Sequence, residues 1–210
     1  MAGTGPTRVG VLGGTFDPIH NGHLAITAAA RRRHDLEYVL LIPAREAPHK
    51  REAPVAGAEH RLAMARLAAE GRAGLRVSDC ELNRPGPSYT VDTMRQLREE
   101  LGPGAGIYFI IGSDMVPDLP AWKEPWELIR LCTLVVAARP AWPMEALDSL
   151  APWLSADQLA QIKAAAVFTT AHPVSSTEVR RRVALGGPIS DLVPGPVARY
   201  ISQNKLYRAP

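Results

Sequence analysis

Short apolar runs alternate with helix-like segments along this 210-residue chain. The runs expected to form buried strands are residues 8–12, 38–42, 75–80, 107–111, 133–138 and 167–169. The segments expected to form helices are residues 23–33, 58–70, 91–101, 126–131, 155–166, 176–185 and 197–203. Strands that alternate with helices build a parallel sheet covered on both faces. The sequence therefore predicts an α/β fold, a doubly wound parallel sheet, with a small helical portion at residues 174–210.

Composition narrows the class of protein. The net charge is only +3, which suits phosphate binding without requiring a nucleic acid, and no aromatic and basic strand pattern typical of RNA binding is present. Cys80 and Cys132 lie too far apart in sequence for a metal motif or a disulfide framework. The first ten residues lack the apolar core of a signal peptide, and no apolar run is long enough to span a membrane. We expect one cytoplasmic domain over residues 1–210, with no membrane partner.

The first motif, GGTFDPIHNGH, follows the first expected strand and begins at Gly13 and Gly14. Two glycines after a strand let backbone N–H groups approach a phosphate, and the N-terminus of the next helix favours anions. The glycine spacing differs from the dinucleotide fingerprint, and no Walker lysine follows. We therefore expect a phosphate site of another kind.

His20 and His23 are three residues apart, on one face of an opening helical turn. Gly22 lies between them and is expected to leave room for a ligand. Two imidazoles there can donate hydrogen bonds to a phosphoryl group as its charge redistributes. The alternatives are a metal pair, for which no third ligand is evident, and a role in helix capping and packing. No metal site is predicted.

The second motif, VSSTEVR, opens a late helix. Ser175 or Ser176 can cap this helix, and Ser176, Thr177 and the backbone N–H groups can form an anion site beside Arg180. The alternative is an ordinary capped helix start followed by solvated arginines.

Together the two motifs resemble the HxGH nucleotidyltransferases, and the second resembles the ISSTxIR motif of adenylyltransferases. Further segments, IPAREAPHK, GPSYTVDTMRQL, YFIIGSDM and LPAWKEPWEL, make the chain similar to bacterial nicotinate-nucleotide adenylyltransferases. This resemblance implies a Rossmann-like fold and adenylyl transfer from ATP, with His20 and His23 as catalytic residues. It also implies that ATP is bound by the following residues: Gly13, Gly14, Thr15, Phe16, His23, Gly112, Asp114, Ser175, Ser176, Thr177 and Arg180.

On the acceptor side, the resemblance implies that Thr90 and Trp122 hold the nicotinate ring of nicotinate mononucleotide. Thr15 would also contact the acceptor, and His49 and Lys50 would reach its phosphate from a loop over residues 44–56 that we expect to be mobile. The alternatives are a core tryptophan at Trp122 and a solvated basic loop around His49.

Rival functions remain open at this stage. The acceptor could be nicotinamide mononucleotide or another phosphorylated compound such as phosphopantetheine, or the chain could be a nucleotide-binding regulator without catalysis. Mg²⁺ is expected to arrive with ATP, because no dedicated carboxylate cage is visible. The sequence leaves a homo-oligomer open.

Overall fold

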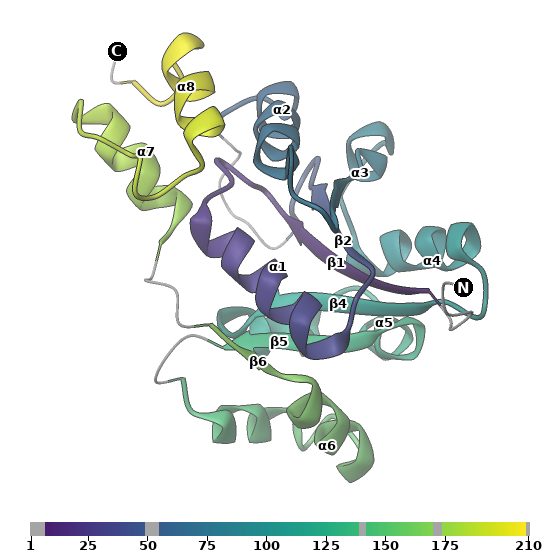
Figure 1. Cartoon of the computed structure of the whole chain (residues 1–210). Helices are drawn as coiled ribbons and strands as arrows, with labels where there is room; N and C mark the ends of the chain where they lie inside the picture. The colour runs from purple at the N-terminus through teal and green to yellow at the C-terminus, as the bar shows by residue number, and fades with distance from the viewer. Residues whose placement is uncertain (1–6, 49–54, 139–141, 170–173, 209–210) are drawn as a thin grey trace.

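A sheet of six parallel strands forms the centre of the chain (Figure 1). The computed structural model describes residues 7–48, 55–138, 142–169 and 174–208. The strands are β1 (Arg8–Gly14), β2 (Tyr38–Pro43), β3 (Leu75–Val77), β4 (Gly106–Gly112), β5 (Thr133–Ala138) and β6 (Val167–Phe168). Their order across the sheet is β3-β2-β1-β4-β5-β6, that of a doubly wound fold. The predicted α/β class is confirmed.

Helices cover both faces of the sheet, as Figure 1 shows. The α-helices are α1 (Asn21–His34), α2 (Ala58–Ala69), α3 (Cys80–Asn83), α4 (Thr90–Leu101), α5 (Pro125–Leu131), α6 (Ala156–Ala165), α7 (Ser176–Ala184) and α8 (Gly195–Gln203). Two 3₁₀ helices, η1 (Ser113–Ala121) and η2 (Met144–Leu150), complete the set in the described ranges.

Two apolar clusters form the core, one on each face of the sheet. Successive residues of β1 point to opposite faces, so Leu12 joins the cluster with α1, α2, α7 and α8, and Val11 joins the one with α4, α5 and η1. This is why the strands of a covered parallel sheet are apolar without interruption. The expected C-terminal helical portion is present as α7 and α8, and α8 packs against α2.

Three local features differ from what the sequence predicted. The strand expected over residues 75–80 ends at Val77, and the chain turns into α3 instead. Residues 113–121 form η1, a 3₁₀ helix that contains Pro117 and Pro120. The α4 helix begins at Thr90, one residue earlier than expected, and its N-cap, Tyr89, makes no side-chain hydrogen bond.

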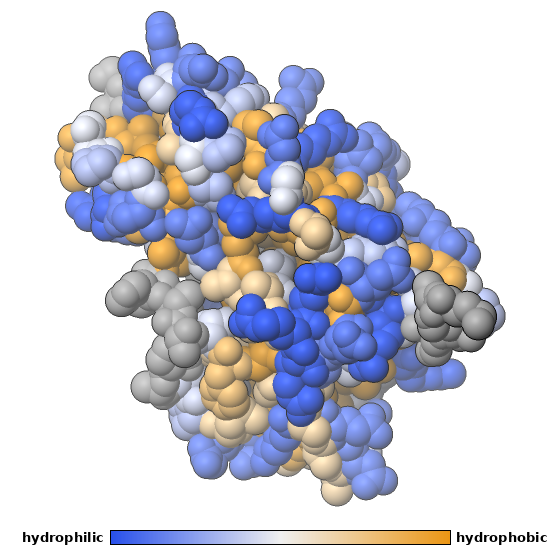
Figure 2. All heavy atoms as spheres, viewed as in Figure 1, coloured by the Kyte–Doolittle hydropathy of each residue, from blue (hydrophilic) through white to orange (hydrophobic). Residues whose placement is uncertain are grey.

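The C-terminal end of α1 combines an exposed basic face with a buried histidine. Figure 2 shows strongly hydrophilic residues gathered over this part of the molecule, where Arg31, Arg32 and Arg33 stand in the last turn. His34 is buried, donates from Nε2 to the Ala165 carbonyl oxygen at 2.8 Å and lies against the Tyr108 ring. It therefore joins α1 to the C-terminal end of α6. No described helix is long and apolar enough to cross a membrane.

Protonation of His34 should destabilise the fold. Burial, as the main cause, lowers the pKa of His34 below its ordinary value of 6.5, and the positive charges of Arg33 and Arg8 act in the same direction. As the pH falls below 6.5, the unfolded chain takes up a proton that the folded chain resists, so the free energy of unfolding decreases. His34→Gln keeps a hydrogen-bond donor without the titration. Its melting temperature should drop less than that of the unmodified protein between about pH 7.5 and about pH 5.5. Equal drops would contradict this role of His34.

Candidate active site

The two predicted nucleotide segments follow the two central strands. β1 and β4 are parallel neighbours, paired as Val11 with Phe109, so their C-terminal ends lie at the same edge of the sheet. β1 ends at Gly14 and leads to α1, whereas β4 ends at Gly112 and leads to η1 on the other face. An open α/β sheet binds ligands at such a switch point.

His20 and His23 form a reciprocal cap at the start of α1. His20 is the N-cap residue, and its Nδ1 accepts from the backbone N–H of His23 at 3.3 Å. In return, Nδ1 of His23 accepts from the backbone N–H of His20 at 3.2 Å. The two rings stack with their centroids 3.6 Å apart, and the edge of the Phe16 ring meets the His23 ring. The capping alternative is therefore realised in this structure.

This cap fixes the tautomer of both imidazoles. A backbone N–H can only donate, so each Nδ1 must be the acceptor, and the ring proton of a neutral histidine then resides on Nε2. In both rings the N–H donor is therefore Nε2, the nitrogen that does not contact the helix backbone. Capping and phosphate recognition use different nitrogens and are compatible.

The second motif docks directly onto the first. Ser175 is the N-cap residue of α7, and its Oγ accepts from the backbone N–H of Glu178 at 3.1 Å. Ser176 Oγ donates to the Pro18 carbonyl oxygen at 2.9 Å, and Arg180 Nη1 donates to the Asp17 carbonyl oxygen at 2.7 Å. Two segments more than 150 residues apart thus form one surface.

Two expectations about the start of α1 need correction. The backbone N–H groups of His20 and His23 are used in the cap, and that of Asn21 donates to the Leu192 carbonyl oxygen at 2.8 Å. These three groups therefore do not face a phosphate here. Gly22 makes room for the His20 ring rather than for a ligand, because a Cβ atom at Gly22 would lie 3.0 Å from His20 Nδ1.

Thr15 and Phe16 form a tight link between β1 and the histidine pair. Thr15 Oγ1 is buried and has no hydrogen-bond partner among the described residues. Phe16 is buried at a φ of 49°, a conformation that costs about 1–3 kcal/mol for a non-glycine residue. Gly14 permits this fold-back, since a Cβ atom there would lie 3.1 Å from the Phe16 ring.

Gly112 and Asp114 form a unit at the end of β4. Asp114 is exposed in the first turn of η1. A Cβ atom on Gly112 would lie 2.3 Å from Asp114 Oδ1, so the glycine allows the carboxylate to fold back over the strand end. A side chain at position 112 would therefore displace the Asp114 carboxylate.

Ser88 ties the acceptor motif to the segment after β2, a link that the sequence did not reveal. Its Oγ accepts from the backbone N–H of Arg45 at 2.9 Å, and its own N–H donates to the Glu46 carbonyl oxygen at 2.9 Å. Buried Glu81 lies beneath and accepts from Thr93 Oγ1 at 2.6 Å, and burial raises the pKa of Glu81. The network holds the start of α4 against the end of β2.

The structure brings the Thr90 and Trp122 segments together. Lys123 Nζ lies 2.9 Å from Asp92 of α4 and 4.7 Å from the centre of the Tyr89 ring. Arg95 of α4 also pairs with Glu124. The indole of Trp122 is buried and lies edge-on to Phe109.

His49 and Lys50 lie outside the described residues, so the structure does not test their expected role or the mobility of the middle of the 44–56 loop. The described ends of that loop are held in place. Ala44 donates its N–H to the Gly14 carbonyl oxygen at 2.9 Å, and the N–H groups of Val55 and Ala56 donate to the Asp17 carboxylate.

Arg61 is a further site residue that sequence reasoning missed. Its side chain is almost fully buried on α2. Nη1 donates to the carbonyl oxygens of Thr15 and Ala44 at 2.8 and 2.7 Å, and Nε donates to that of Ala56 at 3.2 Å. The guanidinium thus joins the ends of β1 and β2 to the residues before α2.

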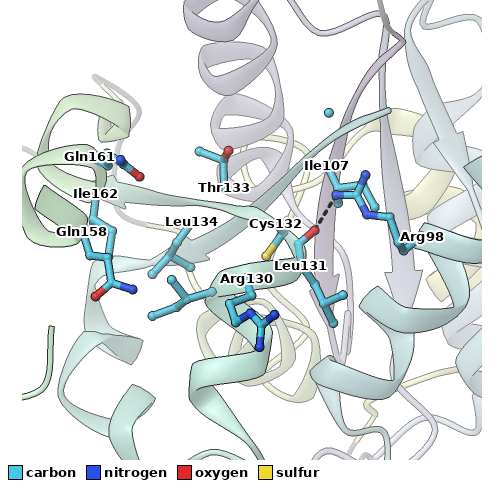
Figure 3. A pocket seen from close by; sticks show the side chains of 12 residues that line it. Arg98, Ile107, Arg130, Leu131, Cys132, Thr133, Leu134, Gln158, Gln161 and Ile162 are labelled. Carbon is cyan, nitrogen blue, oxygen red and sulfur yellow. Dashed lines mark hydrogen bonds between the residues drawn. The ribbon is translucent and has the colours of Figure 1, made fainter. Parts of the chain in front are cut away.

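A cavity of about 290 Å³ lies where the strands begin, at the end of the sheet opposite to the candidate site (Figure 3). None of the predicted site residues lines it. The first residues of β4 and β5 line it, with Gln158 and Ile162 of α6 on one side and Arg98 on the other. Across the described ranges, no group of three or more His, Cys, Asp or Glu residues is arranged to hold a metal ion.

Loss of Arg61 should be severely destabilising. Arg61→Met leaves three buried carbonyl oxygens without this donor and removes the positive charge that acts on Asp17. We expect the free energy of unfolding in urea to fall by about 3–5 kcal/mol. The matched control is Arg66→Met on the same helix, whose side chain is 61% exposed and forms an ion pair with Asp79. This control should change stability by less than about 1 kcal/mol, and similar losses in both variants would contradict the assignment.

Comparison with known proteins gives a consistent family. The cytidylyltransferase-like family model matches residues 11–182. Two curated relatives carry the name "Probable nicotinate-nucleotide adenylyltransferase". The one from Moorella thermoacetica is 40% identical over 98% of this chain and 94% of its own. The one from Roseiflexus castenholzii is 44% identical over 96% of this chain and 98% of its own.

A solved structure supports the fold. The Plasmodium falciparum nicotinic acid mononucleotide adenylyltransferase, complexed with NaAD, superposes with a TM-score of 0.72. The alignment covers 96% of this chain and 97% of that one, at 19% identity. Since the curated relatives exceed 30% identity over nearly the whole length, the chain belongs to the nicotinate-nucleotide adenylyltransferases of the cytidylyltransferase-like family.

Proposed function

We propose that this protein transfers the adenylyl group of ATP to nicotinate mononucleotide, giving deamido-NAD and pyrophosphate in NAD biosynthesis. The observation that carries the proposal is the docking of α7 onto the loop that holds the His20–His23 pair. This arrangement gathers imidazole, guanidinium and helix-terminal donors at the switch point of the sheet, where a polyphosphate is best stabilised. The names of the full-length relatives support the same substrate.

The reaction needs positioning and charge stabilisation more than proton transfer. An oxygen of the acceptor phosphate attacks the α-phosphorus of ATP, a new P–O–P bond forms, and the bond to the bridging oxygen breaks to release pyrophosphate. The attacking oxygen is already ionised, so no general base is required. Donors that meet the charge on the α-phosphate and the leaving group lower the barrier.

On the ATP side, we assign the Nε2–H donors of His20 and His23 to the reacting phosphate. The backbone of Gly13, Gly14 and Phe16 would approach the nucleotide, Thr15 would contact both substrates, and Asp114 beside Gly112 would accept ribose hydroxyls. Ser175, Ser176, Thr177 and Arg180 at the start of α7 would hold the outer phosphates. Enzymes of this family generally use a divalent metal ion with ATP, and we propose Mg²⁺ carried on the phosphates of the nucleotide.

On the acceptor side, Thr90 and Trp122 would frame the nicotinate ring, and His49 and Lys50 would meet its phosphate. The N-terminus of α4 has no side-chain cap, which suits a carboxylate held by backbone N–H groups. Lys123 is already paired with Asp92, so its charge is partly neutralised before any acceptor arrives. We also propose that the chain works as one domain of residues 1–210, because Arg180 and Tyr207 both contact Asp17.

The purified protein, given ATP and Mg²⁺, should release pyrophosphate with nicotinate mononucleotide. Backbone donors suit two carboxylate oxygens, whereas an amide would turn its own NH₂ toward a donor, at a cost of about 1–3 kcal/mol. We expect kcat/KM to be about 10²-fold lower for nicotinamide mononucleotide. Lys123→Ala should keep this preference.

Three results would count against these assignments. Turnover with phosphopantetheine and not with either mononucleotide would overturn the proposed acceptor. Equal kcat/KM values for the two mononucleotides would overturn the choice of the acid while leaving adenylyl transfer intact. A collapse of the preference in Lys123→Ala would show that a side-chain charge, not the backbone, reads the acid.

Variants that keep the helix cap can separate catalysis by the histidines from their structural role. His20→Asn retains a good N-cap acceptor, and His23→Gln retains a side chain that can return a bond to the N-cap backbone. Both remove the Nε2–H donor. We expect near-normal melting temperatures and a kcat about 10²-fold lower in each variant, as for a lost oxyanion donor. A kcat near that of the unmodified protein in both would mean that the pair serves only to cap α1.

A further inference from the structure

Asp17 is the point at which four segments of the chain meet. The residue is 4% exposed. Oδ2 accepts from the backbone N–H of Val55 at 2.8 Å, and Oδ1 accepts from that of Ala56 at 3.1 Å. Val55 comes five residues after Lys50 in the sequence. The carboxylate therefore fixes the backbone at which the acceptor-side loop returns to the described fold.

Tyr207, near the C-terminus, provides a third donor to the same carboxylate. Its hydroxyl donates to Asp17 Oδ1 at 2.7 Å, and the residue is 8% exposed. Burial, and then the hydrogen bond to Asp17, raise the pKa of Tyr207 well above its ordinary value of 10.0. The phenol therefore stays protonated and remains a donor over the whole range in which the protein works.

The ATP side meets Asp17 through its backbone. Arg180 Nη1 donates to the Asp17 carbonyl oxygen at 2.7 Å and lies 3.8 Å from Oδ2. Arg180 bonds the backbone of Asp17, whereas Val55, Ala56 and Tyr207 bond its carboxylate, so a change confined to the carboxylate leaves the Arg180–carbonyl bond in place. Nothing in the chemistry of adenylyl transfer requires a carboxylate here, since its three closest donors all belong to the protein.

We propose that Tyr207 is a positioning residue for the acceptor substrate, acting through the Asp17 carboxylate on the backbone of Val55 and Ala56. The C-terminal segment then does more than complete the core, because its hydroxyl sets the orientation of the carboxylate that holds the end of the 44–56 loop. This inference rests on the proposed adenylyl transfer for its kinetic consequence. The contact that it invokes can be tested without any substrate.

Tyr207→Phe removes the hydroxyl and keeps the ring. In steady-state assays, the KM for nicotinate mononucleotide should rise about fivefold, in the range expected for one hydrogen bond, while kcat and the KM for ATP change less than about twofold. The matched control is Tyr200→Phe on α8, whose hydroxyl bonds His60 Nδ1 at 3.0 Å and does not touch Asp17. It should leave all three parameters unchanged.

Hydrogen exchange measured by NMR provides the readout that does not depend on activity. In Tyr207→Phe, the amides of Val55 and Ala56 should exchange several-fold faster than in the unmodified protein or in Tyr200→Phe, at equal melting temperatures. Asp17→Asn should have a larger effect, because an amide oxygen replaces a carboxylate that faces three donors and its NH₂ would itself face a donor.

The outcomes separate the two proposals. Unchanged exchange of Val55 and Ala56 in Tyr207→Phe would overturn the positioning role, whatever the activity. Faster exchange with an unchanged acceptor KM, in an enzyme active on nicotinate mononucleotide, would also overturn it and leave Tyr207 with a structural role only. No turnover by the unmodified protein would instead overturn the proposed function, and the exchange data would still decide whether Tyr207 orients Asp17.

Discussion

Two buried side chains of opposite charge, Asp17 and Arg61, organise the end of the sheet at which the candidate site lies. The two side chains act on backbone groups of the same neighbourhood: Asp17 accepts from N–H groups of residues 55 and 56, and Arg61 donates to carbonyl oxygens that include that of Ala56. A buried charge is tolerated only where its hydrogen bonds are satisfied. The loop after β1 and the segment before α2 are therefore folded as one unit, and the two motifs of the candidate site depend on its shape.

The parallel sheet could be predicted from the sequence because its strands are apolar without interruption and each is followed by a helix. Short helices were missed for physical reasons. The α3 helix has only four residues, too few for its apolar positions to show a helical periodicity. The prolines of η1 are typical of a loop, although a 3₁₀ helix accommodates them.

The residues of the two sequence motifs were easier to predict from the sequence than the buried residues that support them. His20, His23 and the residues of VSSTEVR carry unusual groups next to predicted helix starts, and the structure brings both motifs together. Asp17, Arg61 and Tyr207 instead bond backbone groups or one another across long separations in sequence, and periodicity says nothing of such contacts. A weak signal existed for Arg61 alone. It lies on the same helical face as Met64, Ala65 and Ala68, and a single arginine on an apolar face of α2 needs buried partners.

The histidine pair shows why a structural and a catalytic interpretation need not compete. A serine or asparagine would cap α1 equally well, so capping alone does not explain two imidazoles in these positions. Imidazole differs in having a second nitrogen, whose protonation is set by the bond that the first one makes. Because each Nδ1 accepts from a backbone N–H, each Nε2 is a donor before any nucleotide binds. The stacking of the rings, together with the edge of Phe16 against His23, limits rotation of both side chains. The helix cap thus orients the donors, and in the proposed transfer no reorganisation is required when the charge on a phosphoryl group redistributes.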